Sequence, residues 1–249
     1  MRWLHTVMGV PMSIDIRDLG DHAEVAEAAF DELRAADALF STYRPDSGLS
    51  RLNRAEVTLD ALGAPFVDVM ELAERFSAVS GGAFTVRDPD GRLDLNGIVK
   101  GWAAEQAADL LRSHGLRDFC VNAGGDIVAA GHPQPSIPWQ IGVRSPGSAE
   151  AMLAVFALTD SAIATSGSYE RGRHIVDGRS GRIAEGLSSV SVITPDLTTA
   201  DVLATTVYAM GRDGVGWAAE RYDCAVLAVT DSGDLIDGGD VRRWLAGAC

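Results

Sequence analysis

The sequence predicts an α+β fold: a single domain with a mixed, largely antiparallel sheet and flanking helices. Long segments with apolar residues at helical spacing fill much of the first half of the chain, whereas short apolar segments separated by glycine-containing turns follow residue 116. No internal repeat, low-complexity segment or linker-like run divides the 249 residues, and a content of 47% hydrophobic residues can fill one core. We therefore expect one domain over residues 1–249.

The first half of the chain contains one predicted strand followed by helices. Alternating apolar residues over 7–17 predict the strand, and helical spacing over 21–44 predicts a helix that leads into an irregular polar loop, 41–53. A second helix is expected over 64–82, where a glycine pair ends it. The segment 93–111 is predicted to form a strand, a turn and a third helix.

Short strands dominate the second half. They are expected at 118–131, 139–146, 151–160, 161–167, 187–195, 224–231 and near 234–237. A further helix is expected over 198–211. The turns between these strands favour a largely antiparallel or mixed sheet over a doubly wound parallel one.

The charge balance restricts the ligands that this chain can bind. With 35 acidic and 21 basic residues, the net charge of −14 repels nucleic acid and anionic lipid surfaces. An anionic small ligand would need a local positive site or a metal. The three cysteines are too few and too scattered for a disulfide framework. No run of about 18 apolar residues and no signal-peptide pattern occurs, so we expect no transmembrane segment and a cytoplasmic location.

A lysine stands at the start of the third predicted helix, where Lys100 follows Asp94 and Gly97. Free backbone N–H groups and the helix dipole favour a phosphate at such a position, and a lysine adds a point charge. The alternative is that Asp94 ends a strand, Gly97 forms a turn and Lys100 is a solvated residue of the first helical turn. Taken alone, this segment favours the alternative.

A carboxylate and a hydroxyl share one face of the predicted helix 198–211. Asp201 and Thr205 are four residues apart, so their side chains are neighbours on the helix surface. Both are hard ligands suited to Mg²⁺. Alternatively, Thr198 and Asp201 form a capping-box variant and Thr205 hydrogen-bonds within its own helix. Taken alone, the pair favours this structural alternative.

His174 is the candidate proton acceptor. It lies in a glycine-rich segment, 161–182, among hydroxyl and charged residues, and histidine titrates near neutral pH. A surface or core histidine is the alternative. The Gly-x-Ser-x-Gly motif of hydrolases is absent. The glycines of 121–131 could approach a phosphate, although a hairpin turn explains them better.

Taken together and in order, these segments resemble the FAD:protein FMN transferase family, the ApbE-type flavin transferases. The matching stretches are Met8-Gly9, "STYRPDSGLSRLN", "GGAF", "LDLNGIVKG", "VNAGGDI", "IATSGSYE", "HIVDGRSG" and "ADVLATTVYAMG". They extend from about residue 8 to residue 211, which is most of the chain.

The resemblance implies a T-shaped α+β fold that binds FAD, splits its pyrophosphate with Mg²⁺ and transfers FMN to a Thr or Ser hydroxyl of an acceptor flavoprotein, with AMP leaving. It implies that Asp201, Thr205 and the backbone carbonyl of Gly97 are metal ligands, and that His174 assists activation of the acceptor hydroxyl. The residues that it implies at the FAD site are Met8, Tyr43, Ala83, Phe84, Thr85, Asp94, Lys100 and Ile175.

Two other activities remain open. Hydrolysis of FAD to FMN and AMP would use the same metal and pyrophosphate site, with water in place of the acceptor hydroxyl. A non-catalytic flavin-binding protein is the second alternative. The presence of Asp201, Thr205 and His174 together argues against it, since a pure binder needs none of them in that arrangement.

The chain departs from the usual family pattern in three places. The segment between Phe84 and Asp94 is shorter than usual. Thr85 stands where an aspartate is usual, and Gly178 stands where a proline is usual.

Overall fold

An eight-stranded antiparallel sheet forms the centre of the structure, a computed structural model that describes residues 1–88, 90–167 and 175–247. Its strand order is β1-β2-β3-β4-β7-β10-β11-β12. The strands are β1 (Arg2–Val7), β2 (Val10–Ile16), β3 (Phe119–Ala123), β4 (Asp126–Ala130), β7 (Ser161–Gly167), β10 (Leu187–Thr194), β11 (Ala225–Thr230) and β12 (Leu235–Gly238).

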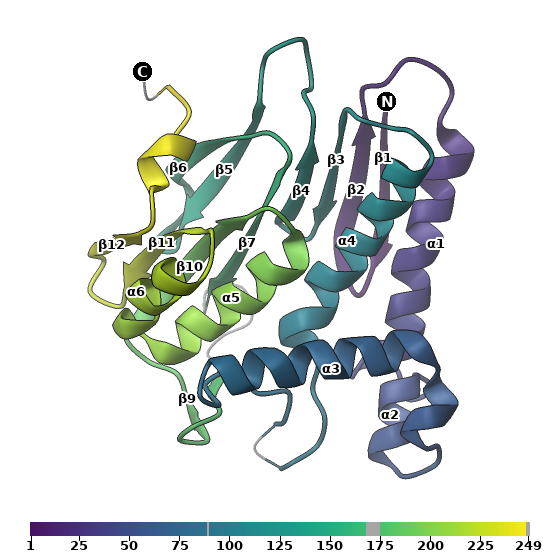
Figure 1. Ribbon diagram of the computed structural model, residues 1–249, viewed down its shortest axis with the longest axis vertical. Coiled ribbons are helices and arrows are strands. Elements are labelled where there is room, and N and C mark those ends of the chain that lie inside the picture. The colour runs from purple at the N-terminus through teal and green to yellow at the C-terminus, as the bar shows by residue number, and fades with distance from the viewer. Residues whose placement is uncertain (89, 168–174, 248–249) are drawn as a thin grey trace.

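Helices cover one face of this sheet (Figure 1). Helices α1, α4 and α5 lie against the strands, α6 packs beside β11 and β12, and α3 crosses the lower end of α4. The helices are α1 (Ala23–Phe40), α2 (Gly48–Asn53), α3 (Ala64–Val79), α4 (Asn96–Ser113), α5 (Leu197–Met210) and α6 (Arg212–Arg221), with short 3₁₀ turns η1 (Leu59–Leu62) and η2 (Val241–Trp244).

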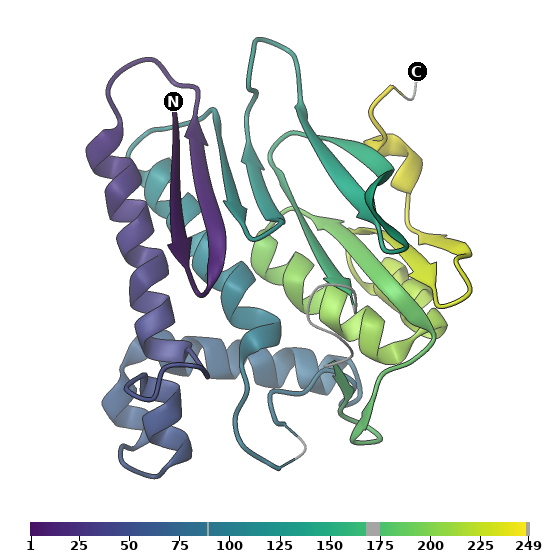
Figure 2. The ribbon, with the colours of Figure 1, turned by 180° about the vertical axis from the view of Figure 1, so that it is seen from behind.

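A separate hairpin lies on the opposite face. Strands β5 (Trp139–Ser145) and β6 (Ser148–Leu158) pair with each other (Figure 2). Their side chains, such as Trp139 and Phe156, pack with Ile127 and Ile163 of the sheet. This second core covers the middle of the sheet, whereas the main core lies under the helices. The short pair β8 (Val176–Asp177) and β9 (Arg182–Ile183) completes the strands.

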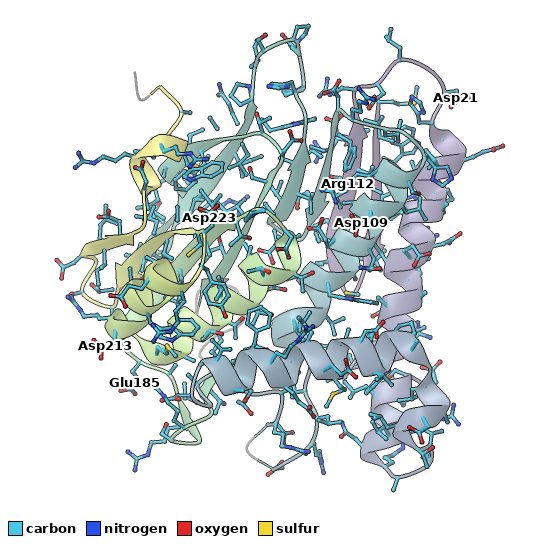
Figure 3. All side chains as sticks on the ribbon, in the orientation of Figure 1. Asp21, Asp109, Arg112, Glu185, Asp213 and Asp223 are labelled. Carbon is cyan, nitrogen blue, oxygen red and sulfur yellow. The ribbon has the colours of Figure 1, made fainter. Side chains whose placement is uncertain are left out.

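A buried carboxylate connects α4 to the start of α5. One oxygen of Glu105 accepts the Leu197 N–H at 2.6 Å, so α4 satisfies a donor that the first turn of α5 leaves free. The other accepts from Arg112 at 2.7 Å, and Arg112 also binds Asp109 (Figure 3). Burial raises the pKa of Glu105, and the Leu197 and Arg112 contacts oppose that rise. The contact holds the two helices in a fixed register.

The α+β fold with a largely antiparallel sheet is confirmed, whereas several local predictions were wrong or incomplete. Most of the expected strand 7–17 is β2, but Met8, with a positive φ of 52°, and Gly9 form the turn of a hairpin with β1, which was not predicted. The loop 41–53 contains α2, because the Ser47 hydroxyl accepts the Ser50 N–H and caps that helix. The strand expected at the start of 93–111 is only an isolated bridge between Leu93 and Arg87, and Gly97 lies inside the first turn of α4 rather than in a turn before it. None of the helices described in the structure is long and apolar enough to cross a bilayer.

Two of the three cysteines lie in the described part of the chain, and neither is disulfide-bonded there. Burial raises the pKa of the Cys120 thiol to about 12 and that of Cys224 to about 11. Both thiols therefore stay protonated at neutral pH, as packing residues do. Cys249 lies outside the described residues.

Candidate active site

A cavity of about 310 Å³ opens where the β1–β2 turn, the end of α1, the first turn of α4, the end of β7 and α5 converge. Every predicted site residue in the described part of the chain lines it: Met8, Tyr43, Ala83, Phe84, Thr85, Asp94, Gly97, Lys100, Ile175, Asp201 and Thr205. His174 lies outside the described residues, immediately before Ile175. The fold thus brings residues nearly 200 positions apart in sequence to one site.

The first turn of α4 forms one wall of this cavity. Asp94 accepts the Asn96 N–H at 2.9 Å, which satisfies one of the free donors at this helix start. A Cβ atom placed on Gly97 would lie 3.2 Å from Thr205 and 3.3 Å from Phe84. The backbone of α4 therefore runs directly beside the Thr205 side chain of α5.

One turn further along, α4 and α5 approach even more closely. The Gly101 N–H donates to the Asp201 carboxylate at 2.8 Å, and Asp201 is only 4% exposed. A Cβ atom on Gly101 would lie 2.6 Å from Asp201 Cβ and 2.7 Å from the Leu197 carbonyl oxygen. The capping-box interpretation of Asp201 was wrong, because Asp196 caps α5 by accepting the Thr199 N–H.

We expect Gly101→Ala to lower the free energy of unfolding by about 1–3 kcal/mol, because the new methyl group forces α4 away from α5. Gly216→Ala is the matched control. Gly216 also lies in a helix, but its Cβ would meet no atom within 4 Å. That change should stabilise the protein by up to about 1 kcal/mol through helix propensity. Urea denaturation of both variants measures the difference, and equal stabilities would contradict the close approach.

A buried ion pair lies beside the cavity, and its cation, Lys100 of α4, lines it. Lys100, whose side chain is 25% exposed, pairs with Asp126, whose side chain is 2% exposed. The other Asp126 oxygen accepts the Thr165 N–H at 3.0 Å. The interpretation of Lys100 as a solvated residue was therefore wrong. Sequence reasoning missed Asp126, although it directly follows the two glycines of the β3–β4 hairpin turn.

Hydroxyl groups lie between this ion pair and α5. The Ser166 and Thr205 hydroxyls lie 3.3 Å apart, and the Thr165 hydroxyl contacts Ser191 at 2.8 Å. Ser166 was counted among the hydroxyl residues of the segment 161–182 but was assigned no role. The pattern that could have identified it is the alternation of side chains in β7, because Ala162, Ala164 and Ser166 all lie on the face of the sheet that the helices cover.

The comparisons with known proteins identify the family of this chain. The family model described as "ApbE family" matches residues 8–88 and 85–228, which is most of the chain. The chain belongs to the ApbE family. The resemblance noted in the sequence is thereby confirmed.

Curated ApbE relatives carry the name FAD:protein FMN transferase. The relative from Vibrio cholerae is 29% identical over 78% of this chain and 75% of its own length. The relative from Haemophilus influenzae is 27% identical over 96% of this chain and 89% of its own length. The assignment of this chain to the flavin transferase enzymes agrees with these names.

Solved ApbE structures share the fold. The flavin transferase ApbE of Vibrio cholerae superposes with a TM-score of 0.85, at 24% identity, over 98% of this chain and 99% of that one. The ApbE protein of Thermotoga maritima gives a TM-score of 0.83, at 22% identity, over 99% of both chains. The overall architecture is thus that of the ApbE structures.

The cavity offers oxygen atoms whose chemistry fits Mg²⁺. Asp201 supplies a carboxylate and Thr205 a hydroxyl from successive turns of α5, while the Gly97 backbone lies against Thr205. Within the described ranges, no group of three or more His, Cys, Asp or Glu side chains could hold a metal. One carboxylate with neutral oxygens suits a hard ion that retains waters or substrate phosphate oxygens. It does not suit zinc, which favours His and Cys ligands.

Two of the three departures from the ApbE pattern contact each other. The Gly178 N–H donates to the Ala83 carbonyl at 3.1 Å. A Cβ atom on Gly178 would overlap the Gly82 carbonyl oxygen and lie 2.8 Å from Thr85 Cβ. A proline at 178 would lose the hydrogen bond and meet these atoms. Gly178 therefore lets this loop pack against the shortened segment that begins at Thr85.

Proposed function

We propose that this chain catalyses the Mg²⁺-dependent transfer of FMN from FAD to a Thr or Ser hydroxyl of an acceptor protein, with release of AMP. The observation that carries the proposal is the convergence of eleven residues, from Met8 to Thr205, on one cavity. The names of the curated relatives support the same reaction.

FAD would occupy the cavity with its pyrophosphate near the first turn of α4. Met8, Phe84 and Ile175 offer apolar surface to the flavin, while Asp94 can orient polar groups of the flavin or ribityl chain. Tyr43 is 78% exposed and stands at the rim. Each of these contacts holds the substrate without taking part in bond breaking.

The pyrophosphate requires local positive charge, because the chain as a whole carries −14. Lys100 and the N-terminal end of α4 supply part of it at the cavity wall. Asp201, Thr205 and the Gly97 carbonyl would hold Mg²⁺, which supplies Lewis acidity to the phosphoryl group when bound. The buried position of Asp201 beside Gly101 keeps its carboxylate in a fixed orientation.

The proposed transfer is a phosphoryl substitution. The acceptor hydroxyl oxygen forms a bond to the phosphorus that carries the riboflavin, the bond from that phosphorus to the AMP oxygen breaks, and AMP leaves with the electron pair. The hydroxyl proton passes to a base, for which His174 is the candidate. Hydrolysis would follow the same route with water as nucleophile.

We expect His174→Ala to slow transfer by about 10² to 10⁴ and to leave FAD affinity nearly unchanged, because a base acts on the acceptor hydroxyl rather than on bound FAD. Single-turnover transfer rates and FAD titration measure the two effects. His132→Ala is a control, because His132 is partly exposed and does not line the cavity. A large loss of FAD binding in His174→Ala would instead make His174 a ligand contact.

The direct test incubates the purified protein with FAD and Mg²⁺, with and without EDTA, and with an acceptor domain that the Vibrio cholerae transferase modifies. AMP release and in-gel flavin fluorescence are followed together, with the Vibrio cholerae enzyme as positive control. Metal-dependent AMP release with a fluorescent acceptor band is the expected result. AMP release without the band would indicate FAD hydrolysis, and flavin binding with no AMP would indicate a non-catalytic flavin-binding protein.

A further inference from the structure

A second cavity, of about 470 Å³, lies on the sheet face opposite the helices. Figure 2 shows this face, with the β1–β2 hairpin on one side and the β5–β6 hairpin on the other. Residues of β1 to β4, β5 and β7 line the cavity, which we call the hairpin groove.

The floor of the hairpin groove is formed by strands β1 to β4, on the face of the sheet that the helices do not cover. Arg2 and Leu4 of β1 alternate along their strand, and Ser13, Asn122 and Ile127 continue the same face across β2, β3 and β4. Leu4 is 64% exposed, so apolar surface is part of this floor.

One wall of the hairpin groove is the edge of a strand. Ile141, Gly142, Val143 and Arg144 are consecutive in β5, and all four line the groove. Successive side chains of a strand point to opposite faces, so four in a row indicate that the edge itself borders the groove. In the described ranges β5 pairs with β6 alone, which leaves the backbone groups of its other edge for an added strand.

The hairpin groove leads into the FAD cavity. Val10, Lys100, Gly124 and Thr165 line both. The β4–β7 ladder ends at the Ile127–Ile163 pair, and beyond it the two strands are joined through the Asp126 side chain. The groove therefore meets the FAD cavity at the Lys100–Asp126 pair, where the pyrophosphate would lie.

The charge of the hairpin groove is opposite to that of the chain. Its lining contains three cations, Arg2, Lys100 and Arg144, and one anion, Asp126, a net charge of +2 in a chain of −14. Lys100 and Asp126 pair with each other. Arg2 donates to the Ser13 hydroxyl at 3.1 Å, and among described residues neither Arg2 nor Arg144 forms an ion pair with a carboxylate.

We propose that the hairpin groove binds an extended, acidic segment of the acceptor protein, which lies along the edge of β5 and presents its Thr or Ser hydroxyl at the Lys100 end. Arg2 and Arg144 attract the acidic side chains, and the β5 backbone fixes the direction of the segment. This inference rests on the proposed transferase function, because it assigns the acceptor its place.

The binding test uses two 15-residue peptides with a central Thr, identical except that one carries four Glu and the other four Lys. Fluorescence anisotropy is measured with FAD and EDTA, so that no turnover occurs. We expect the acidic peptide to bind the wild-type protein and to lose about tenfold or more affinity in Arg2→Glu/Arg144→Glu, because charge reversal turns attraction into repulsion. Arg75→Glu, at an exposed position on α3 outside both cavities, should bind like wild type. Equal affinity of the double variant and wild type, or equal binding of the two peptides, would overturn the proposal.

A kinetic readout separates this proposal from the transferase function. In transfer to the acceptor domain, the double variant should raise KM for the acceptor about tenfold, with KM for FAD and kcat at saturating acceptor unchanged, since neither arginine lines the FAD cavity. An unchanged acceptor KM overturns the docking site and leaves the transferase intact. Failure of the wild-type protein to transfer FMN overturns the proposed function. This outcome is measured on the wild-type protein and does not depend on the double variant.

Discussion

Replacing Asp201 with Ala is expected to abolish Mg²⁺-dependent FMN transfer, because Asp201 is the one anionic group among the three proposed metal ligands. Alanine also leaves the buried Gly101 N–H without its acceptor, which costs about 1–3 kcal/mol of stability. The measurements are AMP release as a function of Mg²⁺ concentration and urea denaturation. Undiminished turnover would rule out the metal assignment.

The Asp201→Asn variant separates these two effects. Asparagine keeps an oxygen that accepts the Gly101 N–H but removes the charge, so stability should be nearly retained while turnover falls by about 10² or more. Asp196→Asn is the matched control on the same helix. Asp196 caps α5, and asparagine caps a helix equally well, so both stability and turnover should stay at the wild-type level.

The second large effect is expected at Lys100. Lys100→Met should lower the free energy of unfolding by about 3 kcal/mol, because Asp126 would remain as a buried charge without its cation. This value is at the lower end of the range expected when one partner of a buried ion pair is removed, because a quarter of the Lys100 side chain is exposed to solvent. The same change should weaken FAD binding and transfer, because the pyrophosphate loses a positive contact.

A double variant distinguishes the structural role of Lys100 from its role toward FAD. In Lys100→Met/Asp126→Asn no unpaired charge is buried, and asparagine still accepts the Thr165 N–H. We expect stability to recover while FAD affinity and transfer stay low. Recovery of both transfer and stability would show that Lys100 has a structural role and no direct role toward FAD. The pair Glu105–Arg112, which lies outside the cavity, serves as control: neutralising it should change stability and leave KM for FAD unchanged.

The long periodic segments were the most predictable part of the fold. Helical spacing located α1, α3, α4 and α5, because an amphipathic helix must bury one face and its sequence shows which one. The short elements were less predictable. The β1–β2 hairpin has a Met-Gly turn in place of the usual Asn-Gly or Asp-Gly, and α2 depends on a cap at Ser47 that a loop could equally contain.

The site residues were predictable only through the resemblance to a family. Periodicity placed Asp201 and Thr205 on one helix face, but by itself it favoured capping and intrahelical contacts for them. Nothing in the spacing indicated that Asp126 would face Lys100 or that Ser166 would approach Thr205. These contacts join separate elements, so no local pattern contains them.

The sequence by itself determined the fold class, the ApbE family and eleven of the residues that line the cavity proposed to bind FAD. These follow from hydrophobic periodicity and from motifs in a fixed order, both of which are local properties of the chain. Only the tertiary structure decided that α4 contacts α5 at Gly101, that Lys100 pairs with Asp126, and that the sheet opens between β4 and β7 beside the hairpin groove. Such features depend on how elements pack against each other. The spacing of residues within one segment does not specify how its side chains fit against a segment that is distant in sequence.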